Sequence, residues 1–326
     1  MQIKNWDEDS FIHHLANQFP ASGTLMGIGD DCAVIPGEEG MAWLATSDAF
    51  VEGVHFLKEQ MAASEVGYKV VAVNVSDIAA MGGKPKYAFL TVAIPSTLDY
   101  EWLKQMTQGV KEACQTWEVL LLGGDTVRSK RDIFISLTLI GSAIQTNLKY
   151  RHMAEPGDLI CVNGYLGDSG GGLKALHTET PNAQRLIDAH FRPQPNPQEA
   201  MWLASHAEVH GMMDISDGLN CDLHRLVTAS KCGGVIELTQ LPISETLRQV
   251  SIANNWNALE LALTGGEDYC LLFTVAKKTF NSINQSFSEK FEKELYNIGE
   301  VTEKIGELSY QENGHPVQMQ LKDFQH

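Results

Sequence analysis

Hydrophobic and polar positions divide the first half of the chain into short segments of helix and strand character. Apolar residues recur with helical spacing from Phe11 to Phe19, after Asp9 and Ser10 and before Pro20, which predicts a short leading helix. Further helices are predicted over residues 64–83 and 100–116. Strands are predicted over residues 32–35, 41–46, 86–94 and 133–144, with a short buried strand over 119–122. This order of elements predicts a mixed sheet covered by helices.

The composition changes near residue 150, where a turn at residues 155–158 precedes an apolar run. We place a domain boundary there, with an N-terminal domain over residues 1–148 and a C-terminal domain over 149–326. Beyond the boundary, helices are predicted over 169–177, 197–210, 218–230 and 244–254, and strands over 159–162, 235–238 and 269–275. Three prolines between Phe191 and Pro197 require an extended connector. The second half is therefore also α/β.

The charge of the chain limits the classes of partner. Lys and Arg number 24 against 41 Asp and Glu, so the formal net charge of −17 repels nucleic-acid phosphates and anionic membranes, and neither partner is expected. The first residues lack the basic-then-apolar order of a secretion signal, and no apolar run approaches the ~20 residues of a membrane span. The six cysteines form no CxxC pair, which is typical of reduced, mostly buried thiols. We expect a cytoplasmic protein.

Six turns that contain Gly or Ser and end in an acidic residue carry the chemical signal. They are residues 27–31 (GIGDD), 46–48 (TSD), 74–77 (NVSD), 123–125 (GGD), 214–217 (DISD) and 265–268 (GGED). Each one alone is an ordinary turn or helix cap. Together they bring carboxylates to apolar runs, and among these turns only Arg128, three residues after Asp125, is basic. Asp oxygens with the hydroxyls of Thr46 and Ser47 suit Mg²⁺, so the pattern predicts nucleotide chemistry with Mg²⁺ as the counter-charge.

The usual nucleotide-binding motifs are missing from the sequence. There is no Walker A loop, no kinase set of motifs and no G-x-G-x-x-G that opens a helix. The glycine-rich segment 167–172 precedes a predicted helix and leaves two interpretations open. It is either a phosphate cradle or a helix N-terminus with close packing.

In combination, seven motifs resemble one known family. GIGDDCAVI, TSDAFVEGVHF, NVSDIAAMGGKP, LLGGDT, EPGDLICV, MMDISDGL and LTGGEDYCLLF occur in the order and spacing of the thiamine-monophosphate kinases, from about Ile3 to the C-terminus. The wider superfamily includes aminoimidazole ribonucleotide synthetase, selenophosphate synthetase and hydrogenase-maturation ATPases. The resemblance implies a two-domain α/β fold of the aminoimidazole ribonucleotide synthetase type. It also implies a homodimer in which the N-terminal sheets form a barrel, with ATP and several Mg²⁺ ions between the domains.

The resemblance further implies roles for single residues. The implied metal ligands are Asp30, Thr46, Ser47, Asp48, Asp77, Asp125, Asp214 and Asp217. The implied ATP contacts are Gly124, Asp125, Arg151 and Ser216, and the implied catalytic residues are Asp48, Asp125 and Asp217. His55, Glu267 and Phe324 would contact thiamine monophosphate. An aromatic residue that the family often has before Gly109 is replaced here by the sequence Met106-Thr107-Gln108.

The implied reaction moves the γ-phosphoryl group of ATP to thiamine monophosphate and gives thiamine diphosphate, the last step of its biosynthesis. The acceptor phosphate is ionised near neutral pH, so no general base is expected. Mg²⁺ would offset the repulsion between the two polyanions. Two alternatives stay open: another ATP-dependent enzyme of the superfamily with a different acceptor, and a non-catalytic Mg²⁺–ATP sensor. A selenophosphate synthetase is disfavoured because a reactive Cys near the N-terminus is missing.

Overall fold

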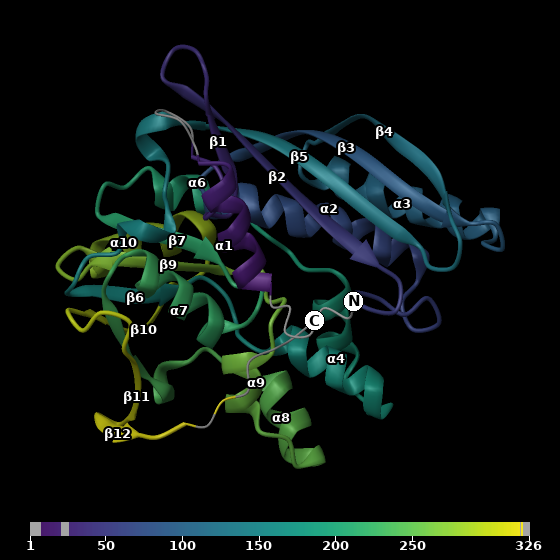
Figure 1. Cartoon of the computed structure of the whole chain (residues 1–326). Helices are drawn as coiled ribbons and strands as arrows, with labels where there is room; N and C mark the ends of the chain where they lie inside the picture. Colours follow the sequence, from purple (N-terminus) through teal and green to yellow (C-terminus); the bar gives the residue numbers. More distant parts are fainter. Residues whose placement is uncertain (1–7, 21–25, 320, 322–326) are drawn as a thin grey trace.

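The computed structural model describes residues 8–20, 26–319 and 321. These residues form two mixed sheets, one from each half of the chain, with helices on their faces (Figure 1). The strand order is β1-β2-β5-β3-β4 in the first sheet and β12-β11-β8-β10-β6-β9-β7 in the second. This architecture confirms the predicted α/β class with a mixed N-terminal sheet.

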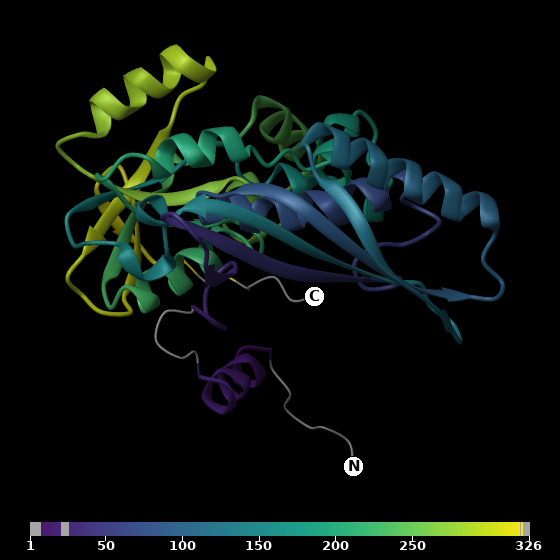
Figure 2. The same cartoon turned by 90° about the horizontal axis from the view of Figure 1, so that it is seen from above.

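The N-terminal sheet is antiparallel except at one edge. Its strands are β1 (Ala33–Pro36), β2 (Met41–Val51), β3 (Lys84–Pro95), β4 (Leu120–Ser129) and β5 (Phe134–Ile144). Strand β4 pairs in parallel with β3 and forms the edge. Helices α2 (Ala63–Ala80) and α3 (Tyr100–Thr116) run along the sheet, whereas α1 (Glu8–Gln18) stands apart from both sheets (Figure 2). These three helices confirm the predicted ones.

Helix α2 is the buried centre of the molecule. Apolar side chains such as Val66, Val70 and Ile78 are almost fully buried, because α2 contacts β2 and β5 on one side and β7 of the second sheet on the other. It crosses α3 closely, since a Cβ on Gly109 would lie 1.8 Å from the carbonyl oxygen of Ser64. Several polar residues of α2 are buried in this position, and two of them form hydrogen bonds with carboxylates of the second half of the chain.

The C-terminal sheet contains seven of the described strands. They are β6 (Asp158–Val162), β7 (Val209–Asp214), β8 (Gly233–Glu237), β9 (Leu271–Ala276), β10 (Tyr296–Thr302), β11 (Leu308–Glu312) and β12 (His315–Val317). The α-helices of this half are α4 (Asp168–Thr178), α5 (Gln184–Phe191), α6 (Pro197–Ala204), α7 (Leu219–Ala229), α8 (Glu245–Asn254), α9 (Ala258–Thr264) and α10 (Phe280–Phe291). Short 3₁₀ turns lie at η1 (Gln145–Asn147), η2 (Arg151–Met153) and η3 (Leu238–Gln240).

Three predicted elements are wrong in extent. The strand predicted over 41–46 continues to Val51 as β2, which pairs with β5 along its whole length. The predicted short buried strand at 119–122 is the start of the ten-residue β4, which is exposed because it is an edge strand that pairs only with β3 among the described strands. The predicted helix over 197–210 ends at Ala204, since the apolar run after it pairs with β9 as strand β7. Helices α5, α9 and α10 and strands β10 to β12 were not predicted. The connector after Phe191 is extended, as predicted.

Candidate active site

Three carboxylates from distant segments meet beside α2. Asp31 lies in the loop before β1, Asp77 on α2 and Asp214 at the end of β7, and one oxygen of each lies within 4.8 Å of the others. We call these three residues the carboxylate cluster. Thr46 Oγ1 donates a hydrogen bond of 2.5 Å to Asp77, and Ser76 Oγ donates one of 2.5 Å to Asp214. Burial, reinforced by neighbouring carboxylates, raises the pKa of Asp77 and Asp214 well above the usual range.

The carboxylate cluster fits a divalent cation. Oδ2 of Asp31 is buried and has no hydrogen-bond partner among the described residues, although Arg151 donates to Oδ1 of the same carboxylate. Buried carboxylate oxygens that lie this close together need a counter-charge when they are ionised. A donor set made only of oxygens is the one that Mg²⁺ prefers. The residues present therefore suit Mg²⁺.

The structure separates the two neighbouring aspartates of the GIGDD turn. Asp31 belongs to the carboxylate cluster, although the sequence analysis named Asp30 as the ligand and did not name Asp31. Asp30 Oδ2 instead accepts the backbone N–H of Arg151 at 3.2 Å, and Arg151 Nε lies 3.8 Å from Oδ1. Burial, together with the charge of Asp31, raises the pKa of Asp30 to about 7. The tandem Asp-Asp motif marked both positions, but only the tertiary structure shows which carboxylate reaches the other two.

Strand β2 brings two further predicted residues toward the carboxylate cluster. Thr46 contacts Asp77 directly, and the charge of Asp48 is one of the causes that raise the pKa of Asp77. Burial raises the pKa of Asp48 itself to about 6. Side chains alternate between the two faces of a strand, and the exposed hydroxyl of Ser47 lies 3.0 Å from that of Thr138 on β5. The side chain of Ser47 is therefore directed away from the carboxylate cluster.

Asp217 belongs to a second acidic group. Ligand atoms of Asp217, Cys221 and Asp222 lie within 4.8 Å of one another, and Arg225 donates to both carboxylates. The backbone N–H groups of Ser216 and Asp217 donate to Asp222 at 3.0 and 2.9 Å. Burial raises the pKa of Asp222 to about 7. Asp217 thus has a protein counter-charge of its own, at the start of α7.

Gly124 and Asp125 lie away from the carboxylate cluster of their own chain. In the strand register, Asp48 pairs with Leu137, Leu137 with Leu90, and Leu90 with Gly124. Three strand spacings, about 14 Å, therefore separate Asp48 from this part of β4. Gly124 has a φ of 150°, and a Cβ there would lie 1.7 Å from the carbonyl oxygen of Leu90, so only glycine fits.

The structure describes two of the three residues that are predicted to contact the substrate. His55 follows β2, where its Nδ1 accepts the N–H of Val51 at 3.1 Å and its ring stacks on Phe50. Glu267 lies in the turn before β9 and forms an ion pair with Lys69 of α2. Phe324 lies outside the described residues.

The glycine-rich segment 167–172 forms the N-terminus of α4. The carboxylate of Asp268 accepts the N–H groups of Gly167 and Ser169 at 2.8 and 3.5 Å. A Cβ on Gly170 would lie 2.6 Å from the Cα of Gly265. Of the two interpretations, close packing around a capped helix is the one that the structure shows.

The sequence comparisons agree with this architecture. The N-terminal and C-terminal domain models of AIR synthase related proteins match residues 29–143 and 155–310. The thiamine-monophosphate kinase of Rhodopirellula baltica is 36% identical over 279 residues, which cover 82% of each chain. That of Escherichia coli (strain K12) is 34% identical and covers 92% of this chain and 91% of the relative. The chain belongs to the thiamine-monophosphate kinase family.

Solved structures of the family have the same fold. AaThiL complexed with AMPPCP and TMP is 32% identical, with a TM-score of 0.86, and the match covers 99% of this chain and 98% of that chain. The thiamine monophosphate kinase from Aquifex aeolicus is 31% identical, with a TM-score of 0.82, and the match covers 97% and 99%. HypE of Escherichia coli, a hydrogenase maturation protein, is 20% identical with a TM-score of 0.69 and shares the fold. The resemblance found in the motifs is confirmed.

Proposed function

We propose that this chain is a thiamine-monophosphate kinase that transfers the γ-phosphoryl group of ATP to thiamine monophosphate. The observation that carries the proposal is the carboxylate cluster at the contact of the two halves, where Asp31 and Asp77 of the first half meet Asp214 of the second. The likeness to AaThiL complexed with AMPPCP and TMP, over nearly the whole of both chains, supports the same conclusion.

The acceptor needs no deprotonation. The second pKa of a phosphate monoester is about 6, so thiamine monophosphate presents an ionised oxygen at neutral pH. This oxygen attacks the γ-phosphorus of ATP, and the bond from that phosphorus to the bridging oxygen of ADP breaks. The obstacle is repulsion, because two unit charges 4 Å apart repel by about 4 kcal/mol at an effective dielectric constant of 20. Positioning and charge neutralisation are therefore the main tasks of the site.

We infer that Asp31, Asp77 and Asp214 would hold Mg²⁺, with Asp48 beside them. When bound, Mg²⁺ would neutralise phosphate charge and orient the oxygens for in-line transfer. The guanidinium group of Arg151 is held next to the carboxylate cluster by Asp31, which places a fixed cation within reach of phosphate oxygens. Arg151 has a second anchor in the hydrogen bond from Ser230 Oγ to its carbonyl oxygen, 2.7 Å long.

The activity test uses purified protein with ATP, Mg²⁺ and thiamine monophosphate. We expect thiamine diphosphate and ADP in equal amounts, and no product when EDTA removes the metal. If Mg²⁺ binds beside Asp48 as proposed, Asp48→Asn should reduce turnover at least about a hundredfold. ATP binding without product would favour the sensor, and transfer to another acceptor would favour a different enzyme of the superfamily.

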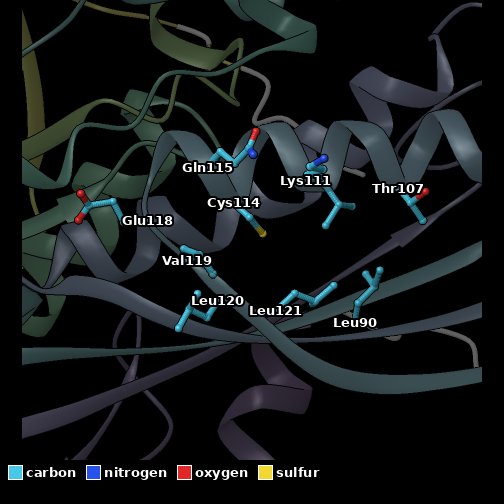
Figure 3. A pocket seen from close by; sticks show the side chains of 10 residues that line it. Leu90, Thr107, Lys111, Cys114, Gln115, Glu118, Val119, Leu120 and Leu121 are labelled. Carbon is cyan, nitrogen blue, oxygen red and sulfur yellow. The ribbon is translucent and has the colours of Figure 1, made fainter.

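We also propose that the enzyme is a homodimer that joins through the N-terminal domain, residues 1–148, while residues 149–326 close the site. The N-terminal sheet exposes several large apolar side chains: Ile35, Met41, Trp43, Phe89, Leu120, Leu122 and Phe134. An apolar groove of about 490 Å³ lies between α3 and β4 along the same edge, lined by residues that include Leu90, Leu120 and Leu121 (Figure 3). An exposed apolar edge strand of this kind favours contact with a second copy.

A dimer would also explain how Asp125 comes close to the candidate active site. Within one chain, about 14 Å separates the strand of Asp125 from that of Asp48. A partner that packs its β4 across the sheet could bring its own Gly124 and Asp125 to the nucleotide. One chain has a mass of 35.9 kDa, and light scattering should give about twice this value in solution.

A mixing experiment tests this sharing of the site. Asp48→Asn and Asp125→Asn should each be inactive, but co-refolded mixtures should regain about a quarter of wild-type activity, because half of the dimers are mixed and each has one intact site. If Asp125 acts within its own chain, the mixture stays inactive.

We propose a cytoplasmic location for the protein. The six cysteines are free thiols in the structure, and four of them are buried, which is typical of a reducing compartment. Among the described helices, none is both long and apolar enough to span a bilayer.

A further inference from the structure

A buried ion pair joins the two halves of the chain at Glu267, one of the residues expected to contact thiamine monophosphate. Lys69 on α2 is 0% exposed, and its Nζ lies 3.0 Å from each carboxylate oxygen of Glu267. A buried ammonium group is strongly disfavoured unless it is paired and hydrogen-bonded. Lys69 and Glu267 therefore compensate each other, although 198 positions separate them in the sequence.

The turn that carries Glu267 is fixed on its other side by backbone hydrogen bonds. Glu267 has a φ of 56°, a left-handed conformation that is uncommon for a residue with a side chain. Its N–H donates to the carbonyl oxygen of Ser216 at 2.6 Å, and the N–H of Tyr269 donates to Ile215 at 2.9 Å. The turn is thus tied to the segment that follows Asp214, and Lys69 connects it to the other half.

Helix α2 links this pair to the carboxylate cluster. Asp77 lies eight residues after Lys69 on the same helix, a separation of about 12 Å at 1.5 Å per residue. One rigid helix therefore sets the position of the Glu267 carboxylate relative to the carboxylate cluster. This arrangement suits a substrate with its phosphate at the carboxylate cluster and its rings at Glu267.

A neutral histidine completes the surroundings of the Glu267 carboxylate. His190 Nδ1 lies 3.1 Å from Glu267 Oε2 and 3.0 Å from Ser169 Oγ. Burial, together with the charge of Lys69, lowers the pKa of His190 to about 4, so the ring is uncharged at neutral pH. Lys69 and Glu267 together then carry no net charge, and the carboxylate meets a ligand as an oriented hydrogen-bond acceptor.

We propose that Lys69 is a positioning residue for thiamine monophosphate, because it holds the Glu267 carboxylate in place across the two halves of the chain. The proposal rests on the proposed function and deepens it. Lys69 would act only through Glu267, so its loss should weaken binding of thiamine monophosphate and leave binding of ATP nearly unchanged.

The test compares Lys69→Met with a matched control, Lys293→Met. Lys293 also pairs with a buried glutamate, Glu199, at 2.7 Å, but it does not contact Glu267 in any described interaction. We expect Lys69→Met to raise the KM for thiamine monophosphate at least tenfold, with the KM for ATP changed less than twofold. Lys293→Met should leave both KM values within twofold of the wild type. Equal increases of both KM values in Lys69→Met, or none, would overturn the proposal.

A second comparison covers a loss of folding in Lys69→Met. The double variant Lys69→Met/Glu267→Gln leaves no charge of this pair buried and unpaired, and it is compared with Glu267→Gln alone. If Lys69 acts through Glu267, the two should have the same KM for thiamine monophosphate within twofold. A further tenfold rise in the double variant would refute the proposal. Wild-type enzyme that forms no thiamine diphosphate would instead refute the proposed function, and this control is measured first.

Discussion

Asp77→Asn is expected to stabilise the metal-free protein. The change removes one charge from the carboxylate cluster but keeps an oxygen that can accept the hydrogen bond of Thr46. One carboxylate oxygen of Asp77 lies within 4.8 Å of an oxygen of Asp31 and of an oxygen of Asp214. At this separation two unit charges repel by about 3.5 kcal/mol at an effective dielectric constant of 20. Protons bound by these carboxyl groups relieve most of the repulsion, so we expect a net gain of about 1–2 kcal/mol at pH 8.

The same change should weaken the stabilisation of the protein by Mg²⁺. In the wild type, we expect Mg²⁺ with AMPPCP to bind only the folded state and to raise its stability by about 2.7 kcal/mol at a hundred times the dissociation constant. Without the Asp77 carboxylate, one of the three proposed ligands is lost, and the Mg²⁺-dependent gain should fall below about 1 kcal/mol. Turnover should fall together with this gain.

Thermal unfolding with EDTA and with Mg²⁺ plus AMPPCP measures both effects. At roughly 2 °C per kcal/mol for a chain of this size, the metal-free variant should melt about 2–4 °C above the metal-free wild type. Asp188→Asn, an exchange of an exposed residue on α5, controls for the general loss of one negative charge. A metal-free variant that melts lower than the wild type, with its Mg²⁺ response intact, would refute the reasoning about the carboxylate cluster.

Three further predictions concern other parts of the site. Asp31→Asn should weaken Mg²⁺ binding at least about tenfold. Asp30→Asn should mainly loosen Arg151 and raise the KM for ATP. Mg²⁺ titrations that rank the two variants in the opposite order would support Asp30 as the ligand. Gly124→Ala puts a Cβ 1.7 Å from a carbonyl oxygen of β3, so it should lower the free energy of unfolding by about 2–4 kcal/mol. An unchanged urea midpoint would contradict the strand geometry. The metal-free wild type should lose stability as the pH rises from about 6.5 to 8, because the folded state keeps protons that the unfolded chain has already released. The direction follows from burial, which raises the pKa of Asp30 and Asp222 to about 7 and that of Asp268 to about 8, so these groups titrate in the folded state within this interval. A thermal melting temperature in EDTA that rises over this interval would contradict the prediction.

The sequence located the acidic residues, but the structure decided how they are grouped. Asp214 and Asp217 belong to one motif, yet Asp214 ends β7 in the carboxylate cluster, while Asp217 lies beside Arg225 at the start of α7. The motif spacing predicts the strand end and the turn, because these depend on local hydrogen bonding. It cannot show which carboxylates converge, because that depends on how the two halves of the chain pack.

Local patterns alone determined most of the elements that carry the site. The helix predicted over 100–116 has the same bounds as α3, since helical periodicity and capping act over a few residues. Local patterns do not show whether a strand is buried. The apolar run at 119–122 predicts a strand, but its pattern is the same whether the strand is covered by its own chain or by a second copy.

Lys69 shows what only the tertiary structure decided. A single lysine in an apolar helical segment gives no sign in the sequence that it is buried, because its partner Glu267 lies 198 positions away. Ionic pairing is set by distance in space and by burial, and both appear only when the chain has folded. The sequence alone thus determined the fold class and the acidic chemistry, whereas the packing of α2 between the two halves decided which charges meet.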